Sequence, residues 1–269
     1  MELSSLAWPE VPDGSILVVA VGSCEQHGPH LPFDTDTRIA VALVEELVRQ
    51  LDDTGPAPGD TDLNDTAPDH TALDRIALER TALDRTAPMV IGPPIGIGAS
   101  GEHEGFPGTL SIGTVALEAV LVELVRSALP SPGSPRPARF RGVVWVNGHG
   151  GNVEAMGRAA ALLSDEGRPI LAWHPRIPDG DSHAGRTETS LLLHLDPGAV
   201  RMDRAAVGST ARWRDIGDIV VAEGLAAVTP NGVLGDPTGA SAAEGATMFE
   251  RLAGQLRDSV VAWRDTLVR

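Results

Sequence analysis

Apolar residues along the chain alternate between short continuous runs and longer stretches with helical spacing. The runs ILVVAV (16–21), GVVWV (142–146) and RPILAW (168–173) are short, apolar and mostly rich in β-branched residues, which predicts buried strands. Residues 36–51 and 114–129 carry apolar positions at the spacing of amphipathic helices. This alternation predicts an α/β protein, a three-layer α/β/α sandwich with a mainly parallel central sheet.

Further helical patterns follow in the second half of the chain. VEAMGRAAALLSDEG comes after the second buried run, TETSLLLHL (187–195) comes after the third, and a long pattern begins at AAEGATMFERL. In open α/β sheets, ligands bind beyond the carboxyl ends of the strands. The polar loops 22–36 and 147–152 occupy that position, so we expect the chemistry of the protein there.

A five-residue repeat interrupts the alternation. From residue 61 the chain reads TDLND, TAPDH, TALDR, IALER, TALDR and TAP. A period of five advances each repeat by about 140° around a helix, so the leucines form no single apolar stripe. We interpret about 52–88 as a low-complexity insertion in a surface loop of one domain spanning 1–269. A partner-binding segment is the alternative. Deleting about residues 57–87 should change stability by little, whereas a large drop in melting temperature, or lost activity with the metals retained, would show that the segment is functional.

Composition excludes several classes of protein. The net charge of −16 argues against nucleic acid as a partner, because phosphate binding needs clustered Lys and Arg. No run approaches the roughly 18 apolar residues of a membrane helix, which predicts a soluble protein. The N-terminal MELSSLAWPEV lacks the basic and apolar regions of a signal peptide. The single Cys24 excludes an intrachain disulfide and favours a reducing, cytoplasmic location.

None of four common catalytic or cofactor-binding features accounts for the polar residues of this sequence. GIGASG (96–101) matches the dinucleotide fingerprint but opens onto EHEGFPG, which does not form the helix that fingerprint requires. We interpret its glycines as allowing close approach of another segment. G-x-S-x-G and H-E-x-x-H are both absent. Cys24 is interpreted as a small filler at a strand end rather than a nucleophile, because no motif pairs it with a base.

Polar side chains that bind metals gather after three of the predicted strands. The candidates are Glu25, His27 and Asp36 in EQHGPHLPFDTD, His149 in NGHGGN, and His183 and Glu188 in HAGRTETS. Carboxylates and imidazoles without cysteine suit Zn²⁺, Mn²⁺ or Fe²⁺. These ligands exceed the needs of one catalytic ion, whereas two ions sharing a bridging carboxylate would use them all.

Four motifs carry a resemblance to a known family. GSCEQHGPHLPFDTD, VNGHGGN, DSHAGRTETS and GVLGDPTGASAAEG closely resemble, in order, the creatininase family of metal-dependent amidohydrolases. The resemblance covers nearly the whole chain apart from about 52–88. It implies an α/β/α fold, a dinuclear metal site and hydrolysis of an amide-type C–N bond.

The resemblance also implies roles for individual residues. Glu25, His27, Asp36 and His149 fall on metal ligands of the family, with Asp36 as the bridge. Gly151 stands where creatininase has a further glutamate ligand, so Glu188 is the expected replacement. His183 resembles the catalytic-side histidine, and either it or Glu188 is expected to pass a proton to the departing nitrogen. The expected cofactors are two divalent ions, Fe²⁺ and/or Zn²⁺, with Mn²⁺ as a further candidate.

Substrate and assembly are implied by the same resemblance. GASGEHEGFPGTLSIGT and HAGRTETSLLLHL are most similar to the branch that cleaves the radical-modified mycofactocin precursor peptide before its C-terminal Val-Tyr-derived pair. A small-molecule amidohydrolase or deformylase, and a non-catalytic metal-binding scaffold, are the alternatives. A homo-oligomer is expected from the family.

Four residues near the predicted site receive lesser roles. Gly151 is expected to leave room for a peptide beside the metals. His103 is expected either to line the cleft or to sit in a loop that packs at the rim or at a subunit contact. His30 and Asp34 are interpreted as surface residues or as supports of the ligands, with Asp34 capping the helix or orienting a histidine.

Overall fold

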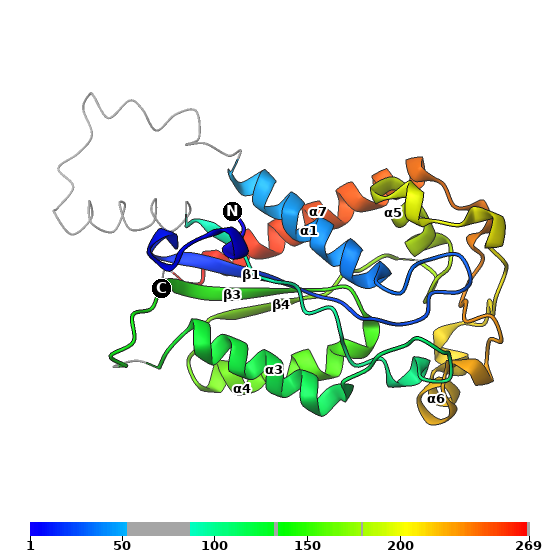
Figure 1. The fold of residues 1–269 in the computed structure, drawn as a ribbon, viewed down its shortest axis with the longest axis horizontal. Helices are drawn as coiled ribbons and strands as arrows, with labels where there is room; N and C mark the ends of the chain where they lie inside the picture. The colour runs from blue at the N-terminus through cyan, green and yellow to red at the C-terminus, as the bar shows by residue number, and fades with distance from the viewer. Residues whose placement is uncertain (53–86, 132–133, 179, 268–269) are drawn as a thin grey trace.

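The computed structural model describes residues 1–52, 87–131, 134–178 and 180–267. Its centre is a parallel sheet with helices on both faces (Figure 1), which confirms the predicted α/β/α sandwich. The pentad repeat and most of the predicted insertion lie outside the described residues, so the interpretation of that segment stays a prediction.

The described strands are β1 (Ser15–Val21), β2 (Met89–Ile91), β3 (Phe140–Asn147) and β4 (Ile170–Trp173). The α-helices are α1 (Thr35–Asp52), α3 (Gly113–Ala128), α4 (Val153–Asp165), α5 (Arg186–Leu195), α6 (Trp213–Glu223) and α7 (Ala242–Arg264). The strand order is β2-β1-β3-β4, and each neighbouring pair is parallel. Because β1 and β3 are neighbours, the loops that follow them leave the sheet side by side.

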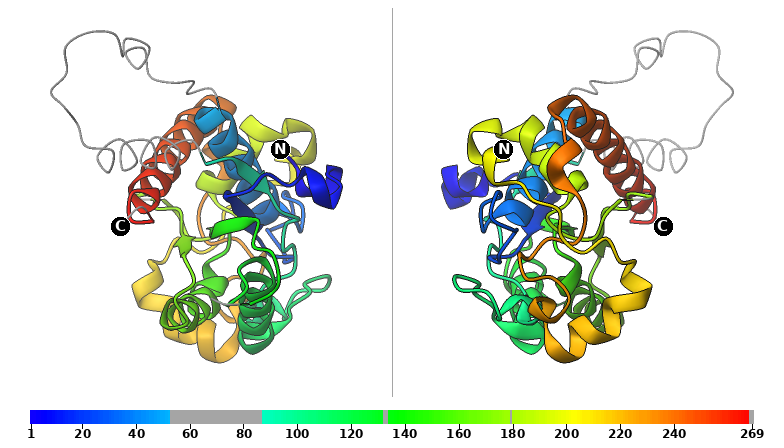
Figure 2. Two further views of the ribbon diagram at one scale, coloured as in Figure 1. Left: turned by 90° about the vertical axis from the view of Figure 1, so that its left-hand side faces the viewer. Right: turned by 90° about the vertical axis from the view of Figure 1, so that its right-hand side faces the viewer.

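Successive residues of β1 belong to opposite faces of the sheet. Ile16 and Val18 belong to the core shared with α1, α5 and α7, whereas Leu17 and Val19 belong to the core shared with α3 and α4. The side views show the same two helical layers (Figure 2). A strand buried on both faces needs apolar residues at every position, which explains the continuous run in the sequence.

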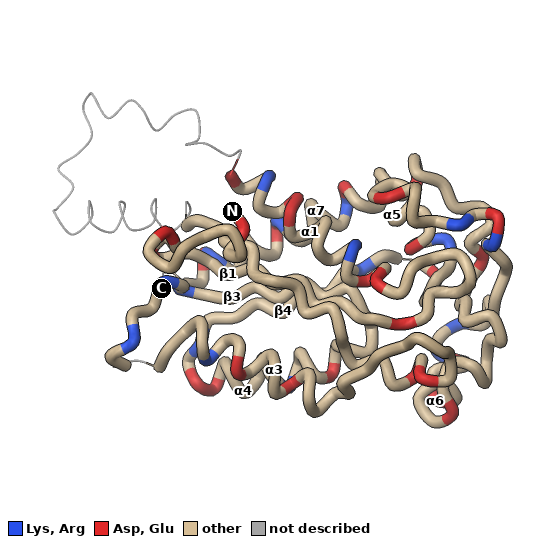
Figure 3. The backbone as a smooth tube through the Cα atoms, in the orientation of Figure 1, with Lys and Arg blue, Asp and Glu red and all other residues tan. Residues whose placement is uncertain are grey.

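Most charged residues lie on the helices and loops, with acidic and basic positions mixed over both helical layers (Figure 3). β1 and β4 carry no charged residue. None of the helices in the described ranges has the length and apolar character needed to cross a bilayer.

Helix α6 was not predicted from the sequence. It buries only Ile216 and Val220 and carries Gly217 in its middle, so its apolar pattern is short and weak. The helix packs beside the 3₁₀ turn η3 (Gly101–His103), on the loop that precedes α3.

The GIGASG segment passes close to other backbone, as its glycines suggested. A Cβ on Gly98 would lie 2.6 Å from the carbonyl oxygen of Gly22 and 2.5 Å from Oδ1 of Asn152. The Asn152 amide joins the same segments, because it accepts from Ala99 N and donates to Gly22 O. Only glycine fits this crossing, which brings the 96–112 loop against the loops after β1 and β3.

Candidate metal centre

The loop between β1 and α1 brings three predicted ligands together. Glu25 and His27 lie beside Asp36, which is in the first turn of α1. His27 Nδ1 is 3.1 Å from the carbonyl oxygen of Glu25, and His27 Nε2 is 3.1 Å from Asp36 Oδ1. The Ser23 hydroxyl donates to Asp36 Oδ2 at 2.7 Å. The His27 imidazole and the Asp36 carboxylate are thus held by the short loop itself.

His149 reaches the same cluster from the end of β3. The chain first turns through Gly148, where any Cβ would lie 2.3 Å from the backbone oxygen of Asp36. His149 Nδ1 is 3.2 Å from Glu25 Oε2 and also 3.2 Å from Asp36 Oδ2. Its Nε2 is 3.3 Å from the carbonyl oxygen of Ala99. Each oxygen of Asp36 therefore faces a different histidine.

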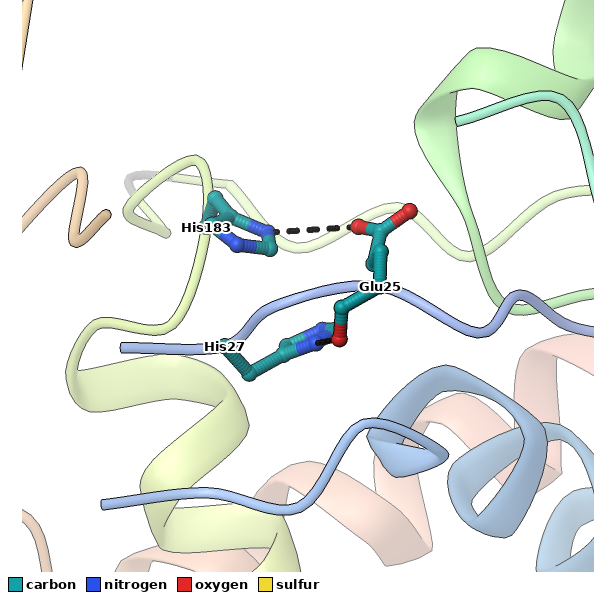
Figure 4. Close-up of side chains that lie close together, drawn as sticks. All are labelled: Glu25, His27 and His183. Atoms are coloured by element: carbon teal, nitrogen blue, oxygen red, sulfur yellow. Dashed lines mark hydrogen bonds and ion pairs between the residues drawn. The ribbon is translucent and has the colours of Figure 1, made fainter. Parts of the chain in front are cut away.

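The third strand-end segment supplies His183 and Glu188. Glu188, in the first turn of α5, accepts a hydrogen bond from Ala184 N at 2.6 Å and lies 3.8 Å from His27 Nε2. His183 Nδ1 points toward Glu25 Oε1 at 3.6 Å, and its ring lies 4.4 Å from that of His27 (Figure 4). The six residues predicted from the sequence thus form one cluster.

Three overlapping sets of side chains have ligand atoms close enough to share an ion. They are Glu25, Asp36 and His149; His27, Asp36 and Glu188; and Glu25, His27 and His183. The first two sets meet at Asp36, with one carboxylate oxygen toward each.

Glu25 provides the test of whether these residues suit a cation. Its side chain is fully buried, and neither carboxylate oxygen has a hydrogen-bond partner in the described part of the chain. A buried carboxylate without donors is strongly destabilising unless a positive charge stands beside it. The donor set therefore fits a bound metal ion.

In the absence of metal, protonated histidines provide that positive charge. Burial raises the pKa of Glu25, but His149 and His103 together bring that pKa down to about 2. Burial lowers the pKa of His27, but Asp36 outweighs it and raises the pKa to about 10. The pKa of His149 is likewise raised, because Glu25 and Asp36 outweigh burial. These two histidines carry charge where a metal ion would otherwise supply it.

The remaining groups shift in the opposite sense. Burial lowers the pKa of His183 well below its usual value and that of His103 to about 4, so both rings are neutral near pH 7. Burial raises the pKa of Glu188 to about 7. Neutral imidazoles and a carboxyl that titrates near neutrality are suited to moving protons.

Three neighbours of the cluster were missed or misplaced by sequence reasoning. Gln26 is buried and contacts two histidines, yet it was passed over between Glu25 and His27. His103 is turned inward, with its Nε2 3.3 Å from Glu25 Oε1, and does not line an open cleft. Glu102 lies 3.6 Å from His149 Nε2. The sequence GEH could have indicated Glu102 and His103, because it places a carboxylate and an imidazole next to each other.

The expectation that Gly151 leaves room beside the metals is wrong. A Cβ there would lie 2.3 Å from the carbonyl oxygen of Ala99 and 2.5 Å from His149 Nε2. It would also lie 2.8 Å from Glu102 Oε1. The 96–112 loop therefore fills the space beside Gly151, and brings a carboxylate of its own.

The other residues considered from the sequence lie outside the cluster. His30 is buried with its Nε2 2.9 Å from the Thr189 hydroxyl. It thereby joins the first loop to α5 and supports the ligands. Asp34 pairs at the surface with Arg38, Oδ1 to Nε 2.8 Å, and contacts no histidine within the described part of the chain. The backbone of Cys24 bridges to Leu110, and its side chain is half-buried.

A groove of about 590 Å³ lies beside the N-terminus of α5 and is separate from the cluster. Asp181, Arg186 and Glu244 contribute to its walls, and none of the six clustered residues lines it. This groove is therefore not the place where the candidate chemistry gathers.

Comparison with known proteins now decides the family. The family model described as creatinine amidohydrolase, creatininase, matches residues 4–260. The chain belongs to the creatininase family. It is 45% identical over 250 residues to the mycofactocin precursor peptide peptidase of Mycolicibacterium smegmatis, covering 93% of this chain and 85% of the relative. The chain is accordingly a hydrolase.

Solved creatininases share the fold. A structure described as creatininase with Mn matches with a TM-score of 0.67 and 19% identity, covering 96% of each chain. A mutant creatininase of Zn-Zn type matches with a TM-score of 0.66 and 21% identity, also covering 96% of each chain. Structures of this fold thus include manganese and zinc forms.

Proposed function

We propose that this chain is a dinuclear metal-dependent peptidase that cleaves the radical-modified mycofactocin precursor peptide. The observation that carries the proposal is the pair of ligand sets that share Asp36. The 45% identity to a peptidase of that name supports the choice of substrate. The bond to be cut precedes the C-terminal Val-Tyr-derived pair, and its cleavage releases the cyclised core.

Two ions account for the clustered ligands. Glu25, Asp36 and His149 would hold one ion, and His27, Asp36 and Glu188 would hold the other. Imidazole and carboxylate donors suit Zn²⁺, Fe²⁺ and Mn²⁺. When bound, two such ions lower the pKa of a water molecule toward neutrality and polarise the carbonyl of the substrate.

We assign the transfer of the proton to His183. Its Nδ1 faces the cluster 3.6 Å from Glu25 Oε1, and its ring is buried. The neutral ring accepts a proton from the attacking water. Because burial lowers the pKa of His183, the protonated ring readily gives that proton to the departing amide nitrogen. Glu188, with a pKa of about 7, takes this role instead if it is not a ligand.

Mass spectrometry of the modified peptide, incubated with zinc-, iron- or manganese-loaded protein, tests the proposal. We expect one new amide cleavage, before the C-terminal pair, and none with Glu25→Gln. Unmodified peptide, creatinine and a formamidopyrimidine serve as comparison substrates under the same metal loading.

Each alternative function has its own outcome in this experiment. Turnover of creatinine or the formamidopyrimidine without peptide cleavage would point to a small-molecule amidohydrolase or deformylase. Retention of both ions without any turnover would point to a metal-binding scaffold.

Assembly and location complete the proposal. We expect a homo-oligomer in the cytoplasm, acting on a peptide and not on nucleic acid or at a membrane. Light scattering of the purified protein tests the assembly, and a monomer at micromolar concentration would contradict it.

A further inference from the structure

Hydrogen-bond partners decide which ring nitrogen of each histidine carries the hydrogen. In three rings of the cluster, one nitrogen lies beside a backbone carbonyl oxygen. Because a carbonyl oxygen can only accept a hydrogen bond, that ring nitrogen must carry the hydrogen. The pairs are His27 Nδ1 with Glu25 O at 3.1 Å, His149 Nε2 with Ala99 O at 3.3 Å, and His183 Nε2 with Gln26 O at 2.8 Å. In the neutral ring, the opposite nitrogen is then bare and faces the carboxylates.

His103 is held in a different way. Its Nδ1 lies 3.1 Å from the side-chain nitrogen of Gln26, which donates. Its Nε2 lies 3.3 Å from Glu25 Oε1 and 3.9 Å from Glu102 Oε1. A nitrogen that faces two carboxylates is more stable with a hydrogen than without one, although neither contact has the alignment of a hydrogen bond.

The orientation of the Gln26 amide follows from two backbone groups. Its oxygen accepts from Gly28 N at 2.9 Å, and its nitrogen donates to Gly232 O at 3.1 Å. His183 Nε2 is also 3.0 Å from that nitrogen, but its own hydrogen already goes to the Gln26 carbonyl. The second amide hydrogen of Gln26 therefore goes to His103 Nδ1.

We propose that Gln26 is a positioning residue that gives two histidines opposite roles. Through its side chain it makes His103 the Nε2–H tautomer, which presents a hydrogen to Glu25. Through its carbonyl it also makes His183 the Nε2–H tautomer, which presents a bare Nδ1 to the cluster. His103 thus steadies a ligand carboxylate, while His183 stays free to accept a proton. These consequences rest on the proposed function, whereas the tautomers themselves do not.

Nuclear magnetic resonance of metal-free protein with ¹⁵N-labelled histidine tests the assignment directly. The chain has 8 histidines, and loss of signals in His103→Gln and His183→Gln assigns the two rings. We expect both to be Nε2–H tautomers in the wild type. In Gln26→Glu the new carboxylate only accepts, so the His103 hydrogen should move to Nδ1. An Nδ1–H tautomer of His103 in the wild type overturns the proposal, even if the variant fails to fold.

Zinc affinity, measured by competition with a chromogenic chelator, tests the consequence for Glu25. His103→Met removes the donor and should weaken zinc binding by about 10–100-fold, the usual effect of losing a partner of a metal ligand. His103→Gln keeps a side-chain N–H and should restore most of the affinity. His194→Gln, at an exposed ring beside Phe249, is the matched control and should leave affinity unchanged.

Wild-type affinity in His103→Met would refute the support of Glu25. A wild type that bound no zinc would refute the proposed metal site. The tautomers would not be affected by that result, because they are measured in metal-free protein.

Discussion

The charge on His27 predicts an unusual pH dependence for the metal-free protein. In the folded chain, burial lowers the pKa of His27 but Asp36 outweighs it, so the pKa stands at about 10 instead of 6.5. Between those values, unfolding releases a proton. Stability from His27 is therefore fully present below pH 6.5 and is lost as pH rises toward 10. One pKa unit corresponds to about 1.4 kcal/mol, so two pH units correspond to about 3 kcal/mol.

The composition makes this window simple to interpret. The chain has no tyrosine, and all 21 of its Lys and Arg residues are arginine, so the usual groups that titrate above pH 9 are missing. Burial lowers the pKa of His103 to about 4, so that ring stays neutral throughout this window, and burial raises the pKa of Glu188 to about 7, so Glu188 completes its ionisation at the lower end of the window. The pKa of His149 is also raised in the folded chain, so His149 likewise contributes stability that is lost as pH rises. The variant His27→Gln keeps His149, so the difference between the variant and the wild type isolates His27.

Urea unfolding of chelator-treated protein at pH 7.5, 8.5 and 9.5 provides the assay. The free energy of unfolding of the wild type should fall by at least about 3 kcal/mol across this range, because any loss from His149 adds to the loss from His27. His27→Gln should be less stable at pH 7.5 and should show a smaller fall. A wild-type free energy that is constant or rises with pH, or an equal fall in the variant, would refute the reasoning.

Three further predictions concern the metals and the packing around them. Asp36→Ala should lose both ions, because each oxygen of Asp36 faces a different ligand set, whereas a wild type that saturates at one ion by elemental analysis would contradict the dinuclear site. Glu188→Gln should retain one ion and lose the other, and retention of two would show that Glu188 is not a ligand. Gly151→Ala should lower the free energy of unfolding by about 1–3 kcal/mol through crowding against Ala99. Gly150→Ala, whose Cβ meets no atom within 4 Å, should change it by less than about 0.5 kcal/mol in the same urea titration.

Much of the fold could be predicted because its signals are local. β1 and β3 are buried on both faces, and such strands require the continuous apolar runs seen in the sequence. The α6 helix escaped prediction because only Ile216 and Val220 are buried along its length. Its place depends on contacts with the 96–112 loop, which no local pattern records.

The candidate ligands were predictable for a topological reason. Glu25 and His149 follow neighbouring parallel strands, so the sheet itself brings them together. The roles of Gln26, His103 and Gly151 were not predictable. They depend on how the 96–112 loop crosses the other loops, and that crossing is set by close backbone contacts at distant positions.

The candidate ligands belong to three separate segments: the loop after β1, the loop after β3 and the first turn of α5. Each proposed ion would be held by two of these segments and would depart only when one of the two moves away, so its residence time would be set by local unfolding and not by the strength of a chelator. For the ion held by His27, Asp36 and Glu188, the exchange rate of a radioactive label should then equal the opening rate of the first turn of α5, as measured by hydrogen exchange. Under such kinetic control, the protein would carry the metal ion that is most available when the chain folds, and not the ion that binds most tightly.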